Sequence, residues 1–248
     1  VSGMPFSMNG HKFHCTVNGG CNPLATTKTV TLGMRTPMTA VLSGSQNMIV
    51  GDTANLTATF TGTAPWSVTL SNGVTFSGVT TAVDTFIYVS PATTTTYTIT
   101  SANDANCSTT DVAYLTGSAL VDVYAVNDHC STAIPLTLSA SCTPITGTTY
   151  NAHASGTATC SGSINSANPD DDVWYEVYKP TALTNLKFRV MNNNAYSGFD
   201  AAFEVFSGTC GSLTSIACVN DYSDLNNGAS ENLSLSGLPY NAGTYYIR

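Results

Sequence analysis

The stretch that decides the fold runs from residue 54 to residue 70 and reads ANLTATFTGTAPWSVTL. Apolar side chains alternate with polar ones in two runs, first Leu56, Ala58 and Phe60 and then Trp66, Val68 and Leu70. Successive side chains of a β-strand point to opposite faces, so this period of two places the apolar residues on one face and the threonines on the other. The stretch therefore predicts two half-buried β-strands.

The composition of the whole chain favours the same class of structure. Only 9% of the 248 residues are charged, against about 25% in an average soluble domain. Threonine, serine, asparagine and glycine provide the polar surface instead; short hydroxyl and amide side chains are poor helix formers, whereas threonine suits a pleated sheet. Because 42% of the residues are hydrophobic, the chain can bury a core in each of two domains. We expect an all-β protein.

The distribution of charged and apolar residues argues against a nucleic-acid partner and against a membrane span. Seven basic residues against fifteen acidic ones give a net charge of −8, without any cluster of Lys or Arg. A surface that binds nucleic acid needs such a cluster to neutralise phosphate, so we expect no nucleic-acid partner. No apolar run approaches the roughly 20 residues of a membrane helix, so we expect no membrane span in this segment.

The two ends of the chain indicate a piece of a larger protein. Residues 1–37 contain HKFHCTVNGGCNP followed by TKTVTLG, which predicts a hairpin stapled by Cys15 and Cys21 and a strand over 29–32. We interpret this segment as the tail of an upstream β domain. Zinc is the alternative for His11, His14 and the two cysteines, but structural zinc sites usually have tighter ligand pairs. The last residues, GTYYIR, resemble a strand cut in mid-course, so we expect truncation there.

Residues 38–126 carry the regularly spaced short strands of a β-sandwich. Ser71–Val74 reads SNGV and predicts a tight turn between two strands. Further strand candidates are DTFIYVSP with Phe86 and Tyr88, TTYTITS with Tyr97 and Ile99, DVAYLTG and LVDVYAV. About seven short strands at this spacing are typical of an immunoglobulin-like sandwich.

This middle segment resembles a known type of repeat. SGSQNMIVGDTANLTATFTGTAPWSVTLSNG and VSPATTTTYTITSANDANC look like the immunoglobulin-like, PKD-related repeats of large secreted and surface proteins of Bacteroidetes. The resemblance rests on the spacing of Gly51 and Leu56, on the Gly62–Trp66 turn and on the threonine-rich approach from Pro91 to Tyr97. Members of that family often carry a cysteine near Met48 that would pair with Cys107. This sequence lacks it, which leaves the pairing of Cys107 open.

Residues 127–248 resemble a second module. NDHCSTAIPLTLSASC, DDDVWYEV and FDAAFEVFSGTCGSLTSIACVND look like the CUB-like or pre-peptidase C-terminal-like β-sandwich of proteins exported by the type IX secretion system. The expected order is therefore an upstream tail, an immunoglobulin-like sandwich and a CUB-like, jelly-roll-like sandwich. A resemblance of fold names no reaction, because function depends on particular sites.

Eight cysteines in a chain with so little charge favour an oxidising, extracellular compartment. Their spacing suggests three local disulfides, which pair Cys15 with Cys21, Cys142 with Cys160, and Cys210 with Cys218. Cys107 and Cys130 are left over, and we expect Cys130 to find a partner beyond Arg248.

Three consecutive carboxylates, Asp170, Asp171 and Asp172, precede the strand VWYEV. Alternation places Val173, Tyr175 and Val177 on one face of that strand and Asp172, Trp174, Glu176 and Tyr178 on the other. We interpret the acids as the polar entry of the strand. The alternative is a calcium site, since calcium takes loop carboxylates and the related modules hold it with loop acids. The candidate ligands are Asp170, Asp171, Asp172, Asp200, Asp221 and Asp224.

No enzyme signature is present in the sequence. The four histidines lie in the upstream tail, beside Cys130 and in a small-residue loop, and no nucleophile elbow, zinc-protease helix or phosphate-binding loop occurs. We expect no required cofactor. The candidate ligand-binding loop is MNNNAYSGFD, which offers amides and aromatic rings suited to sugars: Asn192, Asn193, Asn194, Tyr196 and Phe199.

The sequence is therefore interpreted as a structural or adhesive segment of a secreted surface protein, an adhesin or an extracellular filament. Its expected partners are copies of itself, other surface proteins or cell-surface glycans. One alternative is a set of non-catalytic accessory domains of an exported hydrolase, such as a metalloprotease. The other is a calcium-dependent glycan-binding module.

Overall fold

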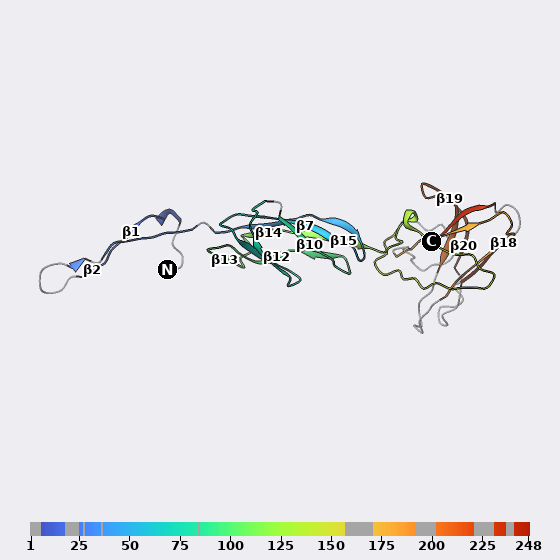
Figure 1. Ribbon diagram of the computed structural model, residues 1–248, viewed down its shortest axis with the longest axis horizontal. Coiled ribbons are helices and arrows are strands. Elements are labelled where there is room, and N and C mark those ends of the chain that lie inside the picture. The colour runs from blue at the N-terminus through green and yellow to red at the C-terminus, as the bar shows by residue number, and fades with distance from the viewer. Residues whose placement is uncertain are drawn as a thin grey trace. The chain divides into compact units, whose positions relative to one another are not determined.

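The computed structural model describes residues 6–17, 25–26, 28–35, 37–83, 85–156, 171–191, 202–220, 231–236 and 241–248. These residues form two compact units that interleave along the chain. The first unit comprises Val1–Ser45, Asn55–Val89 and Thr96–Leu120, and the second comprises Gln46–Ala54, Ser90–Thr95 and Val121–Arg248. Nearly every regular element is a β-strand, which confirms the all-β prediction (Figure 1). No helix in the described ranges is long and apolar enough to cross a membrane.

The first unit begins with a 3₁₀ turn, Phe6–Met8, and two small antiparallel strand pairs. Strand β1 (Lys12–Phe13) pairs with β4 (Val30–Thr31), and β2 (Thr16–Val17) pairs with β3 (Ala25–Thr26). These pairs form the ladder of a hairpin, as the sequence predicts. Cys21 lies outside the described residues, so the predicted pairing of Cys15 with Cys21 stays a prediction.

Two four-stranded sheets follow in the first unit. The first has the order β10–β7–β5–β14 and consists of β5 (Ala40–Ser43), β7 (Ala54–Phe60), β10 (Thr85–Val89) and β14 (Leu115–Gly117). The second has the order β13–β12–β8–β9 and consists of β8 (Trp66–Leu70), β9 (Thr75–Val79), β12 (Ile99–Asn103) and β13 (Ser108–Thr109). Phe60 of one sheet stacks on Trp66 of the other, with ring centroids 5.6 Å apart. The two sheets therefore share a core.

The alternation predicted for residues 54–70 is confirmed in β7 and β8. Leu56 and Phe60 are buried along β7, and Val68 and Leu70 are buried along β8. The SNGV turn joins β8 to β9, where Leu70 N–H donates to Val74 O.

Strand β10 shows what alternation alone does not decide. Ile87 and Val89 face the core, while Phe86 and Tyr88 are 57% and 62% exposed. Both sets of residues are apolar enough to be buried, so the sequence could not indicate which face of this strand lies inside.

A third sheet has the order β11–β15–β6 and consists of β6 (Gln46–Ile49), β11 (Thr95–Tyr97) and β15 (Ala119–Tyr124). Strands β6 and β15 are parallel, with Gln46 opposite Val121 and Ile49 opposite Tyr124. In the first unit β5 and β14 are also parallel, with Ala40 opposite Leu115. Parallel pairs need a long connection between their strands. The connection from β5 to β14 contains the strands β6 to β13, and the connection from β6 to β15 contains the strands β7 to β14.

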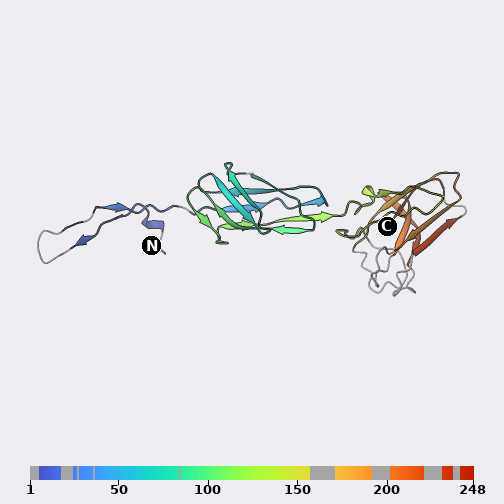
Figure 2. The ribbon, with the colours of Figure 1, turned by 60° about the horizontal axis from the view of Figure 1, so that its bottom comes forward.

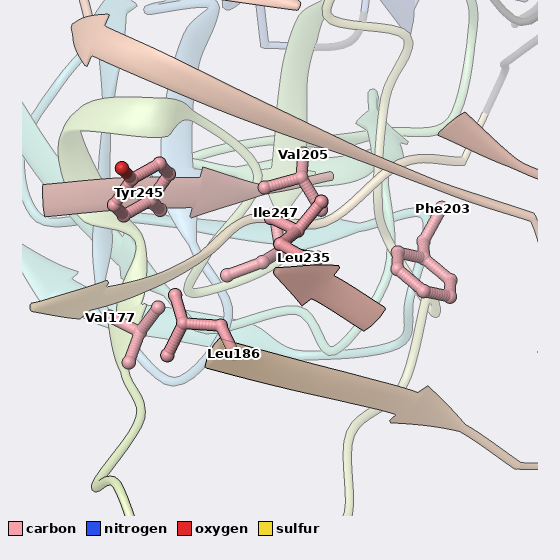
Figure 3. Close-up of a cluster of buried hydrophobic side chains, with 7 residues drawn as sticks. All are labelled: Val177, Leu186, Phe203, Val205, Leu235, Tyr245 and Ile247. Atoms are coloured by element: carbon pink, nitrogen blue, oxygen red, sulfur yellow. The ribbon is translucent and has the colours of Figure 1, made fainter. Parts of the chain in front are cut away.

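The second unit also contains a five-stranded sheet and a two-stranded sheet (Figure 2, yellow-green to red). The five strands, in the order β16–β17–β22–β19–β20, are β16 (Ile134–Pro135), β17 (Tyr175–Lys179), β19 (Phe203–Thr209), β20 (Ser212–Val219) and β22 (Gly243–Ile247). The other sheet pairs β18 (Asn185–Val190) with β21 (Glu231–Ser236). Figure 3 shows the buried cluster that both sheets supply: Val177, Leu186, Phe203, Val205, Leu235, Tyr245 and Ile247.

A disulfide joins Cys130 to Cys210, with Cα atoms 5.5 Å apart and a sequence separation of 80. Cys130 opens a short 3₁₀ turn, Cys130–Thr132, and Cys210 follows β19. The predicted local pair of Cys210 with Cys218 is therefore wrong, and so is the expectation that Cys130 pairs beyond Arg248.

Cys218 is disulfide-bonded as well. Cys142 carries a free thiol, which contradicts its predicted pairing with Cys160, and Cys107 is also free.

The side chain of Asp104 hydrogen-bonds both to the connection between β12 and β13 and to Thr63, which lies shortly before β8. Its Oδ2 accepts the N–H of Thr63 at 2.9 Å, and its Oδ1 accepts the N–H groups of Asn106 and Cys107 at 2.8 and 2.6 Å. These bonds favour the ionised carboxylate, and the one from Thr63 contributes most to holding the pKa of Asp104 below its usual value.

We expect Asp104→Ala to reduce the free energy of unfolding at pH 7 by about 1–2 kcal/mol, because three backbone donors lose their acceptor. A folded-state pKa below the unfolded value gives stability that is present above the unfolded pKa and is lost as pH falls through the folded pKa. Acid unfolding of the variant should therefore depend less on pH below about 4. Urea unfolding at several pH values checks this, with Asp52→Ala as the control; equal pH profiles for the two variants would contradict the assignment.

Reduction of the Cys130–Cys210 disulfide should destabilise the second unit. The bond closes a long loop of the unfolded chain, so its loss in Cys130→Ser should cost about 2–4 kcal/mol. Peptide mapping without reduction should recover residues 130 and 210 in one linked fragment and should find Cys142 alkylated. A linked fragment that joins residues 210 and 218 would contradict this connectivity. Cys142→Ser is the matched control and should leave stability unchanged.

Candidate functional sites

The first polar centre of the second unit contains Asp172, one of the three predicted carboxylates. Strand β17 begins at Tyr175, so Asp172 precedes the strand and does not follow its alternation. Its two oxygens accept the backbone N–H of Ser155 at 3.2 and 3.3 Å, and Oδ2 also accepts the Ser155 hydroxyl at 2.7 Å. Oδ2 lies 3.6 Å from Nη1 of Arg248. Asp172 therefore joins the segment around Ser155 to Arg248.

Arg248 is the cation of this centre. Its Nη2 donates to Glu204 Oε2 at 2.9 Å, and the side chains of Arg248 and Glu204 are only 8% and 3% exposed. The guanidinium carbon lies 5.6 Å from the ring centroid of Trp174 and 5.3 Å from that of Phe206, distances typical of cation–π contacts. A buried charge is costly unless it is paired, and this arrangement pairs one cation with two carboxylates.

Trp174 belongs to the same centre, and its ring centroid lies 5.4 Å from that of Phe206. It is buried, although alternation places it with Tyr178, which is 63% exposed. The difference arises because Trp174 lies before β17, where the period of two does not apply. Its indole N–H donates to Ser155 Oγ at 2.9 Å, and its backbone exchanges hydrogen bonds with Asn127.

The electrostatics of Asp172 reflect its burial. Removal from water raises the pKa of this carboxyl above its usual value, and the Ser155 hydrogen bonds and Arg248 oppose that rise. The oxygens of Asp172 are engaged by Ser155 and Arg248, whereas the neighbouring Asp171 is exposed. In the described ranges, no three His, Cys, Asp or Glu side chains lie close enough to hold a metal ion.

The remaining predicted site residues lie outside the described part of the chain. They are the calcium candidates Asp170, Asp200, Asp221 and Asp224 and the candidate sugar-binding residues Asn192, Asn193, Asn194, Tyr196 and Phe199. These assignments stay predictions.

A second polar centre was missed by sequence reasoning. The imidazole of His153 lies between two carboxylates, with Nε2 3.4 Å from Asp122 Oδ1 and Nδ1 3.7 Å from Asp128 Oδ1. Its ring lies against Tyr124, with centroids 4.2 Å apart. His153 sits in a loop of small residues and is 25 residues from Asp128, so no local pattern indicates the cluster. The only signal was the presence of the two acids around Tyr124.

A third candidate feature is the pair of parallel ladders, β5–β14 and β6–β15. Both are extended beyond the strands by backbone hydrogen bonds, from Ala40 N–H to Tyr114 O and from Val50 N–H to Tyr124 O, each 2.9 Å long. The backbones approach closely at Gly117, where a β-carbon would lie 2.1 Å from Leu42 O. Only glycine fits there, since φ is also +78°.

Comparisons with known proteins add no relative to these observations. No protein-family model matches the sequence, and no curated protein or solved structure matches the chain.

Substitution of Arg248 by Met should be strongly destabilising, because it leaves Glu204 and Asp172 without their cation. We expect a loss of about 3–5 kcal/mol in urea unfolding. Arg189→Met on β18 is the control: Arg189 is exposed, so we expect a change within about 0.5 kcal/mol. Addition of Glu204→Gln to Arg248→Met should restore part of the loss. Equal effects of the two arginine substitutions would contradict the structural role of Arg248.

Proposed function

We propose that this chain is a structural segment of a secreted surface protein, an adhesin or extracellular filament, and that it transmits tension along its β modules. The observation that supports this function is the parallel pairing of β5 with β14 and of β6 with β15. In each pair, one strand belongs to the start of the sandwich sequence and the other to its end.

Parallel pairing determines how the ladders respond to a pull on the chain. The chain enters β5 at Ala40 and leaves β14 at Gly117, and these residues lie at opposite ends of their ladder. The same holds for Gln46 and Tyr124 in the other pair. Tension on the two ends then slides the strands along each other, so all the hydrogen bonds of a ladder resist together. In an antiparallel hairpin pulled at its open end, the bonds break one after another.

The disulfide favours the same function. Tension that reaches Cys130 passes through the covalent bond to Cys210, so the residues between them are not extended while the bond is intact. The intact bond therefore limits how far this part of the chain can lengthen.

An adhesive role has support of its own in the first unit. Phe86 and Tyr88 are exposed on β10, which is the outer strand of its sheet. Aromatic rings on a surface with few charges can bury apolar area against a sugar ring or a second protein without the cost of desolvating ions. Copies of the chain, other surface proteins or glycans are the proposed partners.

Single-molecule force spectroscopy on the whole chain tests the structural function. The chain is pulled through its two ends, and in a second experiment through a handle inserted at Gly73 in the β8–β9 turn together with the C-terminal end. The first geometry loads the parallel ladders in shear, and the second peels the β8–β9 hairpin from its tip. We expect a higher unfolding force in the first geometry. Equal or lower forces would contradict a function in bearing tension.

Two glycine variants provide a matched comparison for this experiment. Gly117 and Gly78 both have positive φ angles, +78° and +72°, but only Gly117 faces a backbone atom of a partner strand. Gly117→Ala should lower the unfolding force between the chain ends and reduce thermal stability. Gly78→Ala should carry the backbone strain without the steric conflict, so its unfolding force should stay close to that of the parent. If the two variants lower the force equally, the β5–β14 ladder is not the element that resists tension.

A further inference from the structure

Asp128 is a buried carboxylate with incomplete hydrogen bonding. Its side chain is 2% exposed, and its Oδ1 accepts the backbone N–H of His153 at 2.5 Å. Its Oδ2 is buried and has no hydrogen-bond partner in the described structure. His129 Nε2 lies 3.7 Å from this oxygen, too far for a hydrogen bond. A buried, incompletely paired carboxylate is costly, so the site gains from a positive charge nearby.

His153 is placed to provide that charge. Its Nε2 is 3.4 Å from Asp122 Oδ1, which is within reach of a hydrogen bond. Its Nδ1 is buried, has no hydrogen-bond partner in the described structure and lies 3.7 Å from Asp128 Oδ1. A neutral imidazole has one N–H and can donate to only one of the two carboxylates. An imidazolium has two, and its charge attracts both.

The other titratable groups around the ring are two acids, a phenol and one imidazole. Asp122 and Tyr124 come from β15, and Asp128 and His129 come from the segment that follows it. Asp172 adds a further negative charge near Asp128, and Arg248 is paired with Asp172 and Glu204. The Thr94 hydroxyl, which donates to Asp122 at 2.6 Å, is the main cause of a lowered Asp122 pKa, and the carboxylate is therefore ionised over the range in which histidines titrate.

We propose that His153 is a proton-operated latch, which on protonation bridges Asp122 and Asp128 and holds the segment 149–156 against β15. That segment has further attachments on both sides of His153. The Asn151 side chain donates to Ala92 O at 2.8 Å, and Ser155 is bound to Asp172. Mild acid would therefore add an ion-pair contact to the segment 149–156, which other hydrogen bonds already attach. Neutral or alkaline conditions would remove that contact. This inference does not depend on the proposed mechanical function.

The sign of the effect on stability follows from proton linkage. In the folded chain the imidazolium has two carboxylates beside it, and the unfolded chain does not hold these partners together. The stability from the latch is then present while the imidazole is protonated and is lost when a rise in pH removes that proton. Measurements should stay above about pH 5, where protonation of carboxylates begins to act in the opposite direction.

Thermal and urea unfolding of the whole chain between pH 8 and pH 5.5 tests the latch. We expect the equilibrium constant for unfolding to fall by about tenfold over this range in the parent chain. His153→Gln keeps one hydrogen-bond donor but cannot become charged, so it should lose most of this pH dependence. His14→Gln, at an exposed histidine of the first unit, is the matched control and should keep it. Equal pH dependence in the parent and His153→Gln would overturn the proposal.

Two further measurements keep the test decisive. If His153→Gln does not fold, Asp122→Asn removes one of the two carboxylates and should reduce the pH dependence without removing His153. Hydrogen exchange at Ala152 and His153 should slow at pH 6 relative to pH 8, after correction for the intrinsic rate, in the parent and not in the variant. Stabilisation by zinc ions at constant pH that disappears in His153→Gln would assign the cluster to a metal and overturn the latch.

Discussion

The parallel pairing of strands from the start and the end of the sandwich sequence is the constraint on which the first sheets depend. Residues 40 and 115, and residues 46 and 121, become direct neighbours through it. The strands between them must then complete the sheets within the connection, which includes the Phe60–Trp66 stack. Gly117 shows how closely the backbones approach, since no other residue has room beside Leu42 O. The same geometry is the basis of the proposed resistance to tension.

The second unit depends on charge in a different way. In a chain with few charged residues, several of them are buried in this unit: Asp128, Lys179, Glu204 and Arg248. Arg248 pairs with both Glu204 and Asp172, so one permanent positive charge serves two carboxylates there. Among the described residues, the groups paired with Asp128 that can become cationic are His129 and His153, which carry charge only when protonated. Two neighbouring carboxylate centres therefore differ in whether their cation is permanent or depends on pH.

These centres also show that the consecutive aspartates Asp171 and Asp172 have different structural roles. Asp172 contributes to the interior, as the link between Ser155 and Arg248, while Asp171 remains at the surface. The acidic strand entry was read from the sequence, but its role was not, because the partners of Asp172 come from segments 17 residues before it and 76 residues after it. The structural function proposed for the chain accordingly draws on strand pairing and covalent connectivity.

The sequence by itself determined the local features: the all-β class, the buried faces of β7 and β8 and the SNGV turn, because side-chain alternation and turn chemistry act over a few residues. Only the tertiary structure decided which face of β10 is buried, which cysteine pairs with Cys130 and which acids flank His153. A disulfide requires Cα atoms about 5.5 Å apart, and an ion pair requires similar proximity. Such distances depend on how the whole chain folds, and spacing along the sequence does not predict them.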